Sequence, residues 1–184
     1  GLLKNIMVQR GVQVEIYLNI VQQEEKVLTE VQEHLILQYL KQQEVMEKVV
    51  ETVPSVVGLK HSAFTFMHIR AFADMGLKCF SGNGAIPLPA LTMGAVGTVD
   101  APLSVAPWHY TELHDAWERG DLESAQRLQD GTKKIVDVVR MFGAPAAVTK
   151  MILSERLGID CGRPIPPVMD LTEEQRPVVL AAAR

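Results

Sequence analysis

The stretch Val56-Val57-Gly58-Leu59-Lys60 decides how the rest of the chain is interpreted. It reads as a short buried strand that ends in a lysine, and a helix is predicted directly after it, over Phe64 to Met75. A lysine at the carboxyl end of a buried strand is expected to be partly desolvated, which favours the neutral amine. A neutral amine can attack a ketone and form a Schiff base. The alternative is that Lys60 simply extends into solvent, as most lysines at strand ends do.

Two further runs repeat this pattern at intervals of about twenty residues, namely Leu77–Gly82 and Ala95–Val99. Each is short, mostly apolar, bounded by glycine and followed by a helix-like segment. Such alternation predicts parallel β/α units whose strands are covered by helices on both faces. In these folds the chemistry collects where strands run into their following loops, which is where Lys60, Gly82 and Val99 lie.

The order of three segments in this region carries a resemblance to a known family. The segments are Val57-Gly58-Leu59-Lys60-His61-Ser62, Phe80-Ser81-Gly82-Asn83-Gly84-Ala85 and Leu91-Thr92-Met93-Gly94-Ala95-Val96-Gly97. Together they resemble the class I pyruvate aldolases, a family that includes dihydrodipicolinate synthase, N-acetylneuraminate lyase and 4-hydroxy-2-oxoglutarate aldolase. The likeness covers roughly residues 53 to 180. It implies an α/β fold, the (β/α)8 TIM barrel, of which this chain would supply strands 5 to 8 and the carboxyl-terminal helices.

The resemblance also implies roles for individual residues. Lys60 would be the Schiff-base lysine on the sixth barrel strand, and Gly82 would lie beside the pyruvate carboxylate on the seventh. Asn83 would line the substrate site next to Gly82, and Val99 would place backbone beside the imine on the eighth strand. The alternative is that the glycines are ordinary turn residues. The resemblance implies neither a cofactor nor a metal.

The amino-terminal region offers a second candidate catalytic residue. Val12–Ile20 resembles the family's fifth strand, where a tyrosine shuttles protons during imine formation, and Tyr17 is the candidate. A phenol can act as general acid and base if it lies within hydrogen-bond distance of the reacting group. Val21 departs from the family pattern, which usually has proline there, and Tyr17 lies further from Lys60 than in the family. The alternative is an ordinary strand tyrosine.

The extra length lies in Gln22 to Val53, where apolar residues fall near helical spacing among Gln, Glu and Lys. This pattern predicts one or two amphipathic helices, either an elongated barrel helix or a short coiled coil. We expect residues 1–143 to form a partial barrel that includes this atypical stretch, and residues 144–184 to form a carboxyl-terminal helical extension. Several residues of the carboxyl-terminal part are typical of helix ends, namely Asp121, Gly143, Pro145, Gly158 and the pair Thr172 and Gln175.

Length limits both the fold and the activity. A complete (β/α)8 barrel typically needs about 250 residues, whereas this chain has 184 and begins with Gly1. We therefore expect the carboxyl-terminal part of a larger protein, a truncated product, or one half of a barrel completed by another chain. Such an arc would leave open strand edges and an exposed inner face. The family's Gly-Thr-Thr-Gly-Glu loop is missing, so very weak or no turnover is expected from this chain alone.

Two functions from different classes follow. The first is an aldolase that condenses pyruvate with an aldehyde, or releases it, through a Schiff base on Lys60. Asn83, Gly84 and Ala85 replace the Asp-Glu pair that binds sugar hydroxyls in the sialic acid lyases, so sialic acid is disfavoured as a substrate. The second is an impaired barrel fragment that acts as an interaction or regulatory subunit. The family also implies a homo-oligomer, specifically a homotetramer.

Composition excludes several other classes. Hydrophobic residues make up 47% and charged residues 22%, which suits a globular domain without a membrane span. The net charge of −4 and the lack of a basic stripe argue against nucleic acid as a partner. Cys79 and Cys161 lack metal-ligand spacing, and His109 and His114 are five apart and do not share a helix face well. Free thiols favour a reducing compartment, so we expect a cytoplasmic protein, with a mitochondrial location left open.

Overall fold

A computed structural model describes residues 42–63 and 65–183 of the chain. The predicted strand Val12–Ile20, with Tyr17, lies outside these residues, as does most of the stretch Gln22 to Val53. Residues 42–52 are helical, so the predicted helix is confirmed for that part of the stretch. The boundary between two compact units of the chain falls between Val57 and Gly58. The division expected at 143/144 from the sequence stays a prediction.

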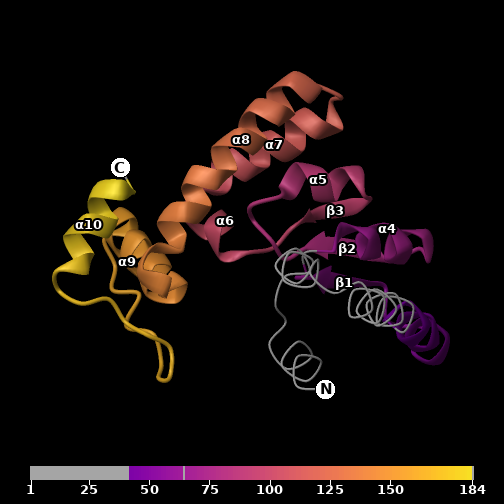
Figure 1. Cartoon of the computed structure of the whole chain (residues 1–184), viewed down its shortest axis with the longest axis horizontal. Helices are drawn as coiled ribbons and strands as arrows, with labels where there is room; N and C mark the ends of the chain where they lie inside the picture. The colour runs from indigo at the N-terminus through magenta and orange to yellow at the C-terminus, as the bar shows by residue number, and fades with distance from the viewer. Residues whose placement is uncertain (1–41, 64, 184) are drawn as a thin grey trace, which may run out of the picture. The chain divides into compact units, whose positions relative to one another are not determined.

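A three-stranded parallel sheet forms the beginning of the second unit, as the sequence predicts. Its strands β1 (Gly58–His61), β2 (Lys78–Ser81) and β3 (Ala95–Thr98) lie in the order β1-β2-β3. The helices α4 (Phe66–Asp74) and α5 (Pro87–Thr92) connect them, as Figure 1 shows. This repeated strand–helix alternation, with parallel pairing throughout, is the arrangement of a barrel wall.

The register of the sheet follows from two local features. Gly58 pairs with Lys78, and a side chain at position 58 would overlap the Lys78 carbonyl, so the close approach of β1 to β2 requires glycine. Between β2 and β3 the register shifts by one residue. Cys79 pairs with Ala95, but the next residue, Phe80, pairs with Gly97, so Val96 is an extra residue in β3. A bulge of this kind bends the strand and increases its twist.

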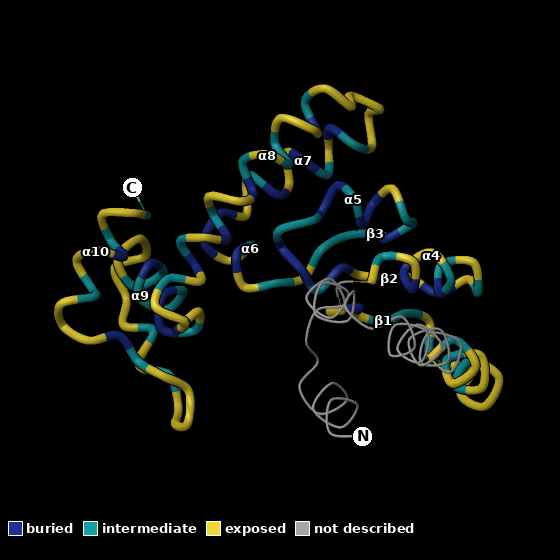
Figure 2. Tube along the Cα trace, in the orientation of Figure 1, coloured by how far each residue is buried: buried dark blue, intermediate teal, exposed yellow. Residues whose placement is uncertain are grey.

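Exposed and buried residues alternate along β2, so the two faces of the sheet differ in burial; Figure 2 colours the chain by burial. His61, Cys79 and Ala95 point toward α4 and α5 and are buried. Lys60 and Phe80 are partners across β1 and β2 on the opposite face, where Lys60 is exposed and Phe80 is 38% exposed. The expectation that helices cover both faces is therefore wrong for the described part of the chain. An exposed inner face, as expected for an unclosed arc, is confirmed there.

The carboxyl-terminal part is helical. Its elements are α6 (Ala101–Val105), α7 (Pro107–Glu118), α8 (Leu122–Val139), the 3-10 turn η1 (Met141–Gly143), α9 (Pro145–Leu157) and α10 (Gln175–Ala182). Helices α7 and α8 pack side by side (Figure 1), and α9 packs against α6 and α10. Arg156 on α9 contacts several of these elements. It donates hydrogen bonds to the carbonyls of Val105, the last residue of α6, and Ala183, just after α10, and its Cζ lies 5.3 Å from the centre of the Trp108 ring on α7.

Most predicted helix ends are confirmed, but α8 ends at Val139 with Arg140 as its C-cap, so the prediction that Gly143 ends this helix is wrong. Asp121 accepts a hydrogen bond from the backbone N–H of Ser124 at the start of α8, as an N-cap does. Gly143 and Gly158 adopt left-handed backbone conformations, with φ of 67° and 65°, after α8 and at the end of α9. Thr172 and Gln175 exchange the two hydrogen bonds of a capping box, of 3.0 and 3.4 Å.

A buried cluster between α6, α8, α9 and α10 holds the carboxyl-terminal helices. Its members are Val105, Val139, Ala144, Ala147, Val148, Ile152, Leu171 and Val179. None of the helices that the structure describes is long and apolar enough to cross a bilayer.

The packing of this cluster yields a first prediction. Ile152 is 2% exposed, whereas Ile159, just after the same helix, is 56% exposed. Ile152→Ala should lower the free energy of unfolding by about 2–5 kcal/mol, because it removes apolar contacts and leaves a cavity. Ile159→Ala, the matched control, should change it by less than about 0.5 kcal/mol. Urea unfolding followed by circular dichroism measures both, and equal shifts for the two variants would contradict the assigned core.

Candidate functional site

Lys60 and Gly82 lie side by side at the carboxyl end of the sheet. Lys60 is the third of the four residues of β1, and Gly82 directly follows β2. The N–H of Gly82 donates a 2.7 Å hydrogen bond to the carbonyl of His61, which extends the pairing of the two strands by one residue. A Cβ atom at position 82 would overlap the Ser62 hydroxyl and lie 2.7 Å from Cε of Lys60. The lysine side chain therefore runs along a surface that only glycine leaves open.

The environment of Lys60 differs from the expectation in one respect. The sequence predicts that the ammonium of Lys60 is partly desolvated at the end of a buried strand, but Lys60 is exposed. That expectation is wrong for the described residues. The physical reason is that the sheet is covered only on the His61 side, so the side chain of Lys60 points from the open face. The pairing of β1 with β2 nevertheless places the side chain of Lys60 beside Gly82.

The other candidate residues lie along the same edge of the sheet. The N–H of Val99 donates a 2.8 Å hydrogen bond to the carbonyl of Ser81, so the backbone after β3 is held beside the residue that precedes Gly82. Asn83 is buried, and its side-chain oxygen accepts a 3.1 Å hydrogen bond from the N–H of Ala85. The structure thus brings together Lys60, Gly82, Asn83 and the backbone of Val99, whereas Tyr17 lies outside the described residues.

Three polar side chains hold the loop after β2 through hydrogen bonds to its backbone, and the sequence did not single them out. Asp100 accepts a 2.7 Å hydrogen bond from the N–H of Gly84, and the Tyr110 hydroxyl donates a 2.8 Å bond to the Gly84 carbonyl. Burial, and then the negative charge of Asp100, raises the pKa of Tyr110, so its hydroxyl stays a donor. Gln129 on α8 donates to the Ala85 carbonyl and accepts from the N–H of Leu88.

Only weak signals in the sequence could have pointed to these residues. Asp100 stands one residue before a helix with proline in its first turn, which is a common N-cap position. Gln129 falls within a segment that resembles the aldolases, but nothing in its spacing connects it to residues 44 and 41 positions earlier. Such long-range hydrogen bonds become visible only when the helices are placed.

A sequence model described as the dihydrodipicolinate synthetase family matches residues 38–184, which is most of the chain. The chain belongs to this family. As the resemblance implied, this is the family of the class I aldolases, and the described parallel sheet matches part of the barrel fold of its solved relatives. The chain corresponds to the carboxyl-terminal part of longer relatives.

Individual relatives agree with this assignment. A 4-hydroxy-tetrahydrodipicolinate synthase of Mycobacterium leprae is 33% identical over 124 residues, which cover 66% of this chain and 40% of the relative. Among solved structures, the Proteus mirabilis N-acetylneuraminate lyase matches with a TM-score of 0.69 at 22% identity, covering 77% of this chain and 48% of the lyase. A catalytic lysine mutant of the Ruminococcus gnavus sialic acid aldolase matches with a TM-score of 0.66 at 23% identity, covering 72% and 45%. This member of the family thus spans about half the length of the relatives it matches.

One cavity beside the sheet does not include Lys60. It has a volume of about 320 Å³ and lies between the end of β3 and the helices α5 and α7, and Phe80, Thr98, Tyr110 and His114 are among its lining residues. Lys60 does not line it. The lysine instead faces the exposed side of the sheet, so the candidate site lies at the carboxyl ends of β1 and β2 and not in this cavity.

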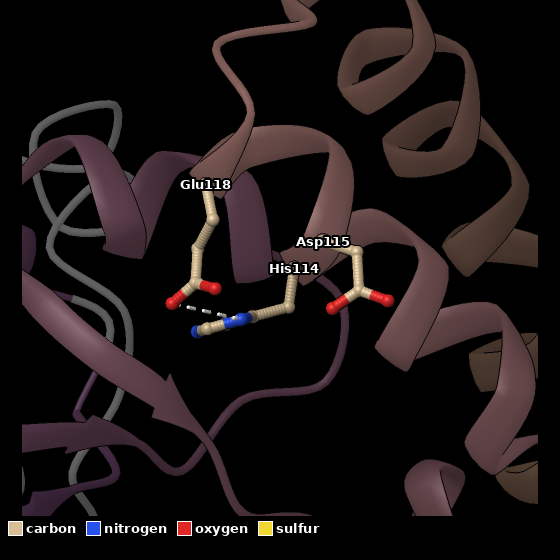
Figure 3. A group of neighbouring side chains, drawn as sticks. All are labelled: His114, Asp115 and Glu118. Atoms are coloured by element: carbon tan, nitrogen blue, oxygen red, sulfur yellow. Dashed lines mark ion pairs between the residues drawn. The ribbon is translucent and has the colours of Figure 1, made fainter.

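Two histidines of α7 have local partners. A ring nitrogen of His109 lies 2.8 Å from the Leu128 carbonyl, and one of His114 lies 3.3 Å from the Val96 carbonyl, so the two histidines make separate contacts. His114, Asp115 and Glu118 gather on one stretch of α7, with ligand atoms within 4.8 Å of one another (Figure 3). Both acids are exposed, and His114 and Glu118 are 3.7 Å apart at helical spacing, which is the ordinary arrangement of a solvated helix face.

His61 packs behind the sheet, as the alternation of strand side chains predicts. It is 7% exposed and meets His68 and Phe72 of α4 edge-on, with ring centres 5.6 and 6.1 Å apart. Burial lowers the pKa of His61, and the nearby His68 lowers it further. Burial also lowers the pKa of His68. The fold therefore holds His61 in its neutral form.

This burial gives a second prediction. Because the unfolded chain takes up a proton on His61 near pH 6.5 while the folded chain resists it, acid favours unfolding. The free energy of unfolding should be highest above pH 6.5 and should decline as the pH falls below it. His61→Leu should make that decline shallower, with part remaining from His68. Urea unfolding at a series of pH values checks this, and an identical decline in the variant would refute it.

Proposed function

We propose that this chain carries the imine-forming part of an aldolase site, in which Lys60 forms a Schiff base with a 2-oxo acid, pyruvate in the simplest case. The observation that carries the proposal is the contact between Lys60 and Gly82 at the carboxyl end of two paired parallel strands. In (β/α)8 barrels the chemistry takes place at this end of the strands. The catalytic lysine named for the Ruminococcus gnavus aldolase supports the same class of reaction.

The chemistry follows from a primary amine that can reach a ketone. The nitrogen of Lys60 attacks the ketone carbon, and the adduct loses water to give a protonated imine. Loss of a proton from the neighbouring methyl group gives an enamine, whose carbon attacks the carbonyl carbon of an aldehyde. Water then hydrolyses the new imine, which releases the product and restores the amine. Cleavage runs through the same steps in reverse.

The surrounding residues take the roles that their positions allow. Gly82 leaves room beside the lysine for the carboxylate of the 2-oxo acid. Asn83 stabilises that turn, and Val99 supplies backbone at the next strand end. Tyr17 is our candidate for the general acid and base. The aldehyde partner and the homotetramer belong to the same proposal.

Borohydride trapping with pyruvate, followed by peptide mass spectrometry, tests the imine directly. The parent chain should acquire a reduced pyruvyl adduct on Lys60, and Lys60→Ala and Lys60→Arg should acquire none there, because neither offers a primary amine. Lys78→Ala is the matched control, since Lys78 is an exposed lysine on the neighbouring strand, and it should be labelled like the parent.

The outcomes separate the two functions. An adduct that persists at full yield in Lys60→Ala would refute the assignment of the lysine. A folded parent chain that forms no adduct would favour the alternative, an interaction or regulatory subunit. Circular dichroism of every variant establishes that the comparison is made on folded protein.

Gly82→Ala tests the geometry of the proposed site. The new methyl group would overlap the Ser62 hydroxyl and Cε of Lys60, which can rotate away, but it would also lie 2.9 Å from Cβ of Ser62, which moves only with its backbone. The free energy of unfolding should therefore fall by about 1–3 kcal/mol, while displacement of the amine should reduce trapping by about tenfold or more. In Gly97→Ala the methyl group would lie 3.4 Å from the Phe80 ring, an ordinary contact, and trapping should be retained. Unchanged trapping in Gly82→Ala would contradict the proposed geometry.

A further inference from the structure

We propose that Asp100 is a positioning residue, which holds the turn Gly82-Asn83-Gly84 at a fixed place relative to Lys60. The proposal rests on the function proposed above, because it concerns the same site. Asp100 follows Val99 directly after β3, while the turn that it holds follows β2. A single carboxylate thus links the two loops that lie beside the candidate lysine.

Both oxygens of the Asp100 carboxylate are in use. Oδ2 accepts a 2.7 Å hydrogen bond from the N–H of Gly84, and Oδ1 accepts a 2.8 Å bond from the N–H of Ala101 at the start of α6. Hydrogen bonds to an ionised acceptor are shorter and stronger than neutral ones. Since Oδ1 is held at the end of the third strand and Oδ2 at the loop of the second, the carboxylate fixes the separation of the two loops.

Gly84 is held on its other side as well. The hydroxyl of Tyr110 on α7 donates to the carbonyl of Gly84, so both polar groups of this residue have partners. Gly84 is buried, and a Cβ atom there would lie 3.1 Å from Cγ of Pro102 and 3.2 Å from Oδ2 of Asp100. The residue therefore has little freedom to move toward or away from Asp100.

The position of Gly84 decides the position of Gly82. The Cα atoms of Gly82 and Gly84, two positions apart in the chain, can lie at most about 7 Å from each other, so a shift of Gly84 is transmitted to Gly82. Gly82 in turn lies against Cε of Lys60. A carboxylate suits this task better than an amide, because an asparagine has one acceptor oxygen and can serve only one of the two N–H groups. Asp100 thus acts on the lysine through the turn, without touching it in the arrangement that the structure describes.

The experiment compares Asp100→Asn and Asp100→Ala with the parent chain in two measurements. Hydrogen exchange followed by mass spectrometry reports protection of residues 82–88, and borohydride trapping reports the pyruvate concentration for half-maximal labelling of Lys60. Asp100→Ala should lose protection in this segment and raise that concentration about tenfold, while Asp100→Asn should raise it by about threefold. The maximal extent of labelling should be kept, because the amine itself is unchanged.

Two further variants make the outcome decisive. Tyr110→Phe removes the opposite bond to Gly84 and should act in the same direction as Asp100→Asn. Asp130→Ala changes an exposed aspartate on α8 and should match the parent in both measurements. Asp100→Asn keeps the shape of the side chain and provides the comparison if Asp100→Ala does not fold.

The two proposals fail in different ways. Protection of residues 82–88 that is unchanged in both Asp100 variants would overturn the positioning role, whatever the chemistry of Lys60. Unchanged half-maximal concentrations would overturn it equally. A parent chain that forms no adduct would overturn the proposed function, while the exchange measurement would still decide whether Asp100 holds the turn.

Discussion

The parallel pairing of β1 with β2 is the constraint on which the rest of the second unit depends. This pairing requires glycine at position 58, where a side chain would overlap the Lys78 carbonyl. The pairing also continues beyond the two strands, because the N–H of Gly82 donates a hydrogen bond to the His61 carbonyl. Because the register is set there, Lys60 and Phe80 lie side by side on one face, and His61 and Ser81 on the other. A slip of one residue would exchange the two faces and remove Lys60 from its position beside Gly82.

The two faces of the sheet have different surroundings. The face that carries His61, Cys79 and Ser81 is closed by helices, and its burial supplies the apolar contacts that stabilise the sheet. The face with Lys60 and Phe80 is exposed in the part of the chain that the structure describes. Chemistry on this face needs groups that approach from outside the three strands. The matched region covers 40% to 48% of these relatives, so they have the chain length to supply such groups.

Loops after the strands are held more firmly than their glycine content suggests. Gly82-Asn83-Gly84 could be a flexible turn, but Asp100, Tyr110 and Gln129 bind its backbone and that of Ala85 from three different segments. Backbone groups that are paired in this way lose conformational freedom before any ligand arrives. The helices α7 and α8 therefore hold this loop, although they lie far along the chain.

The sequence by itself determined the strands around Lys60, Gly82 and Val99, the helix ends at Asp121, Gly158 and Thr172, and the family. These features depend on local patterns, such as apolar runs, caps and glycines, which act within a few residues. Only the tertiary structure decided that Lys60 is exposed, that His61 packs beside His68, and that Asp100 and Tyr110 hold Gly84. The physical reason is that exposure and long-range hydrogen bonds depend on which elements pack together, and no spacing along the chain records that.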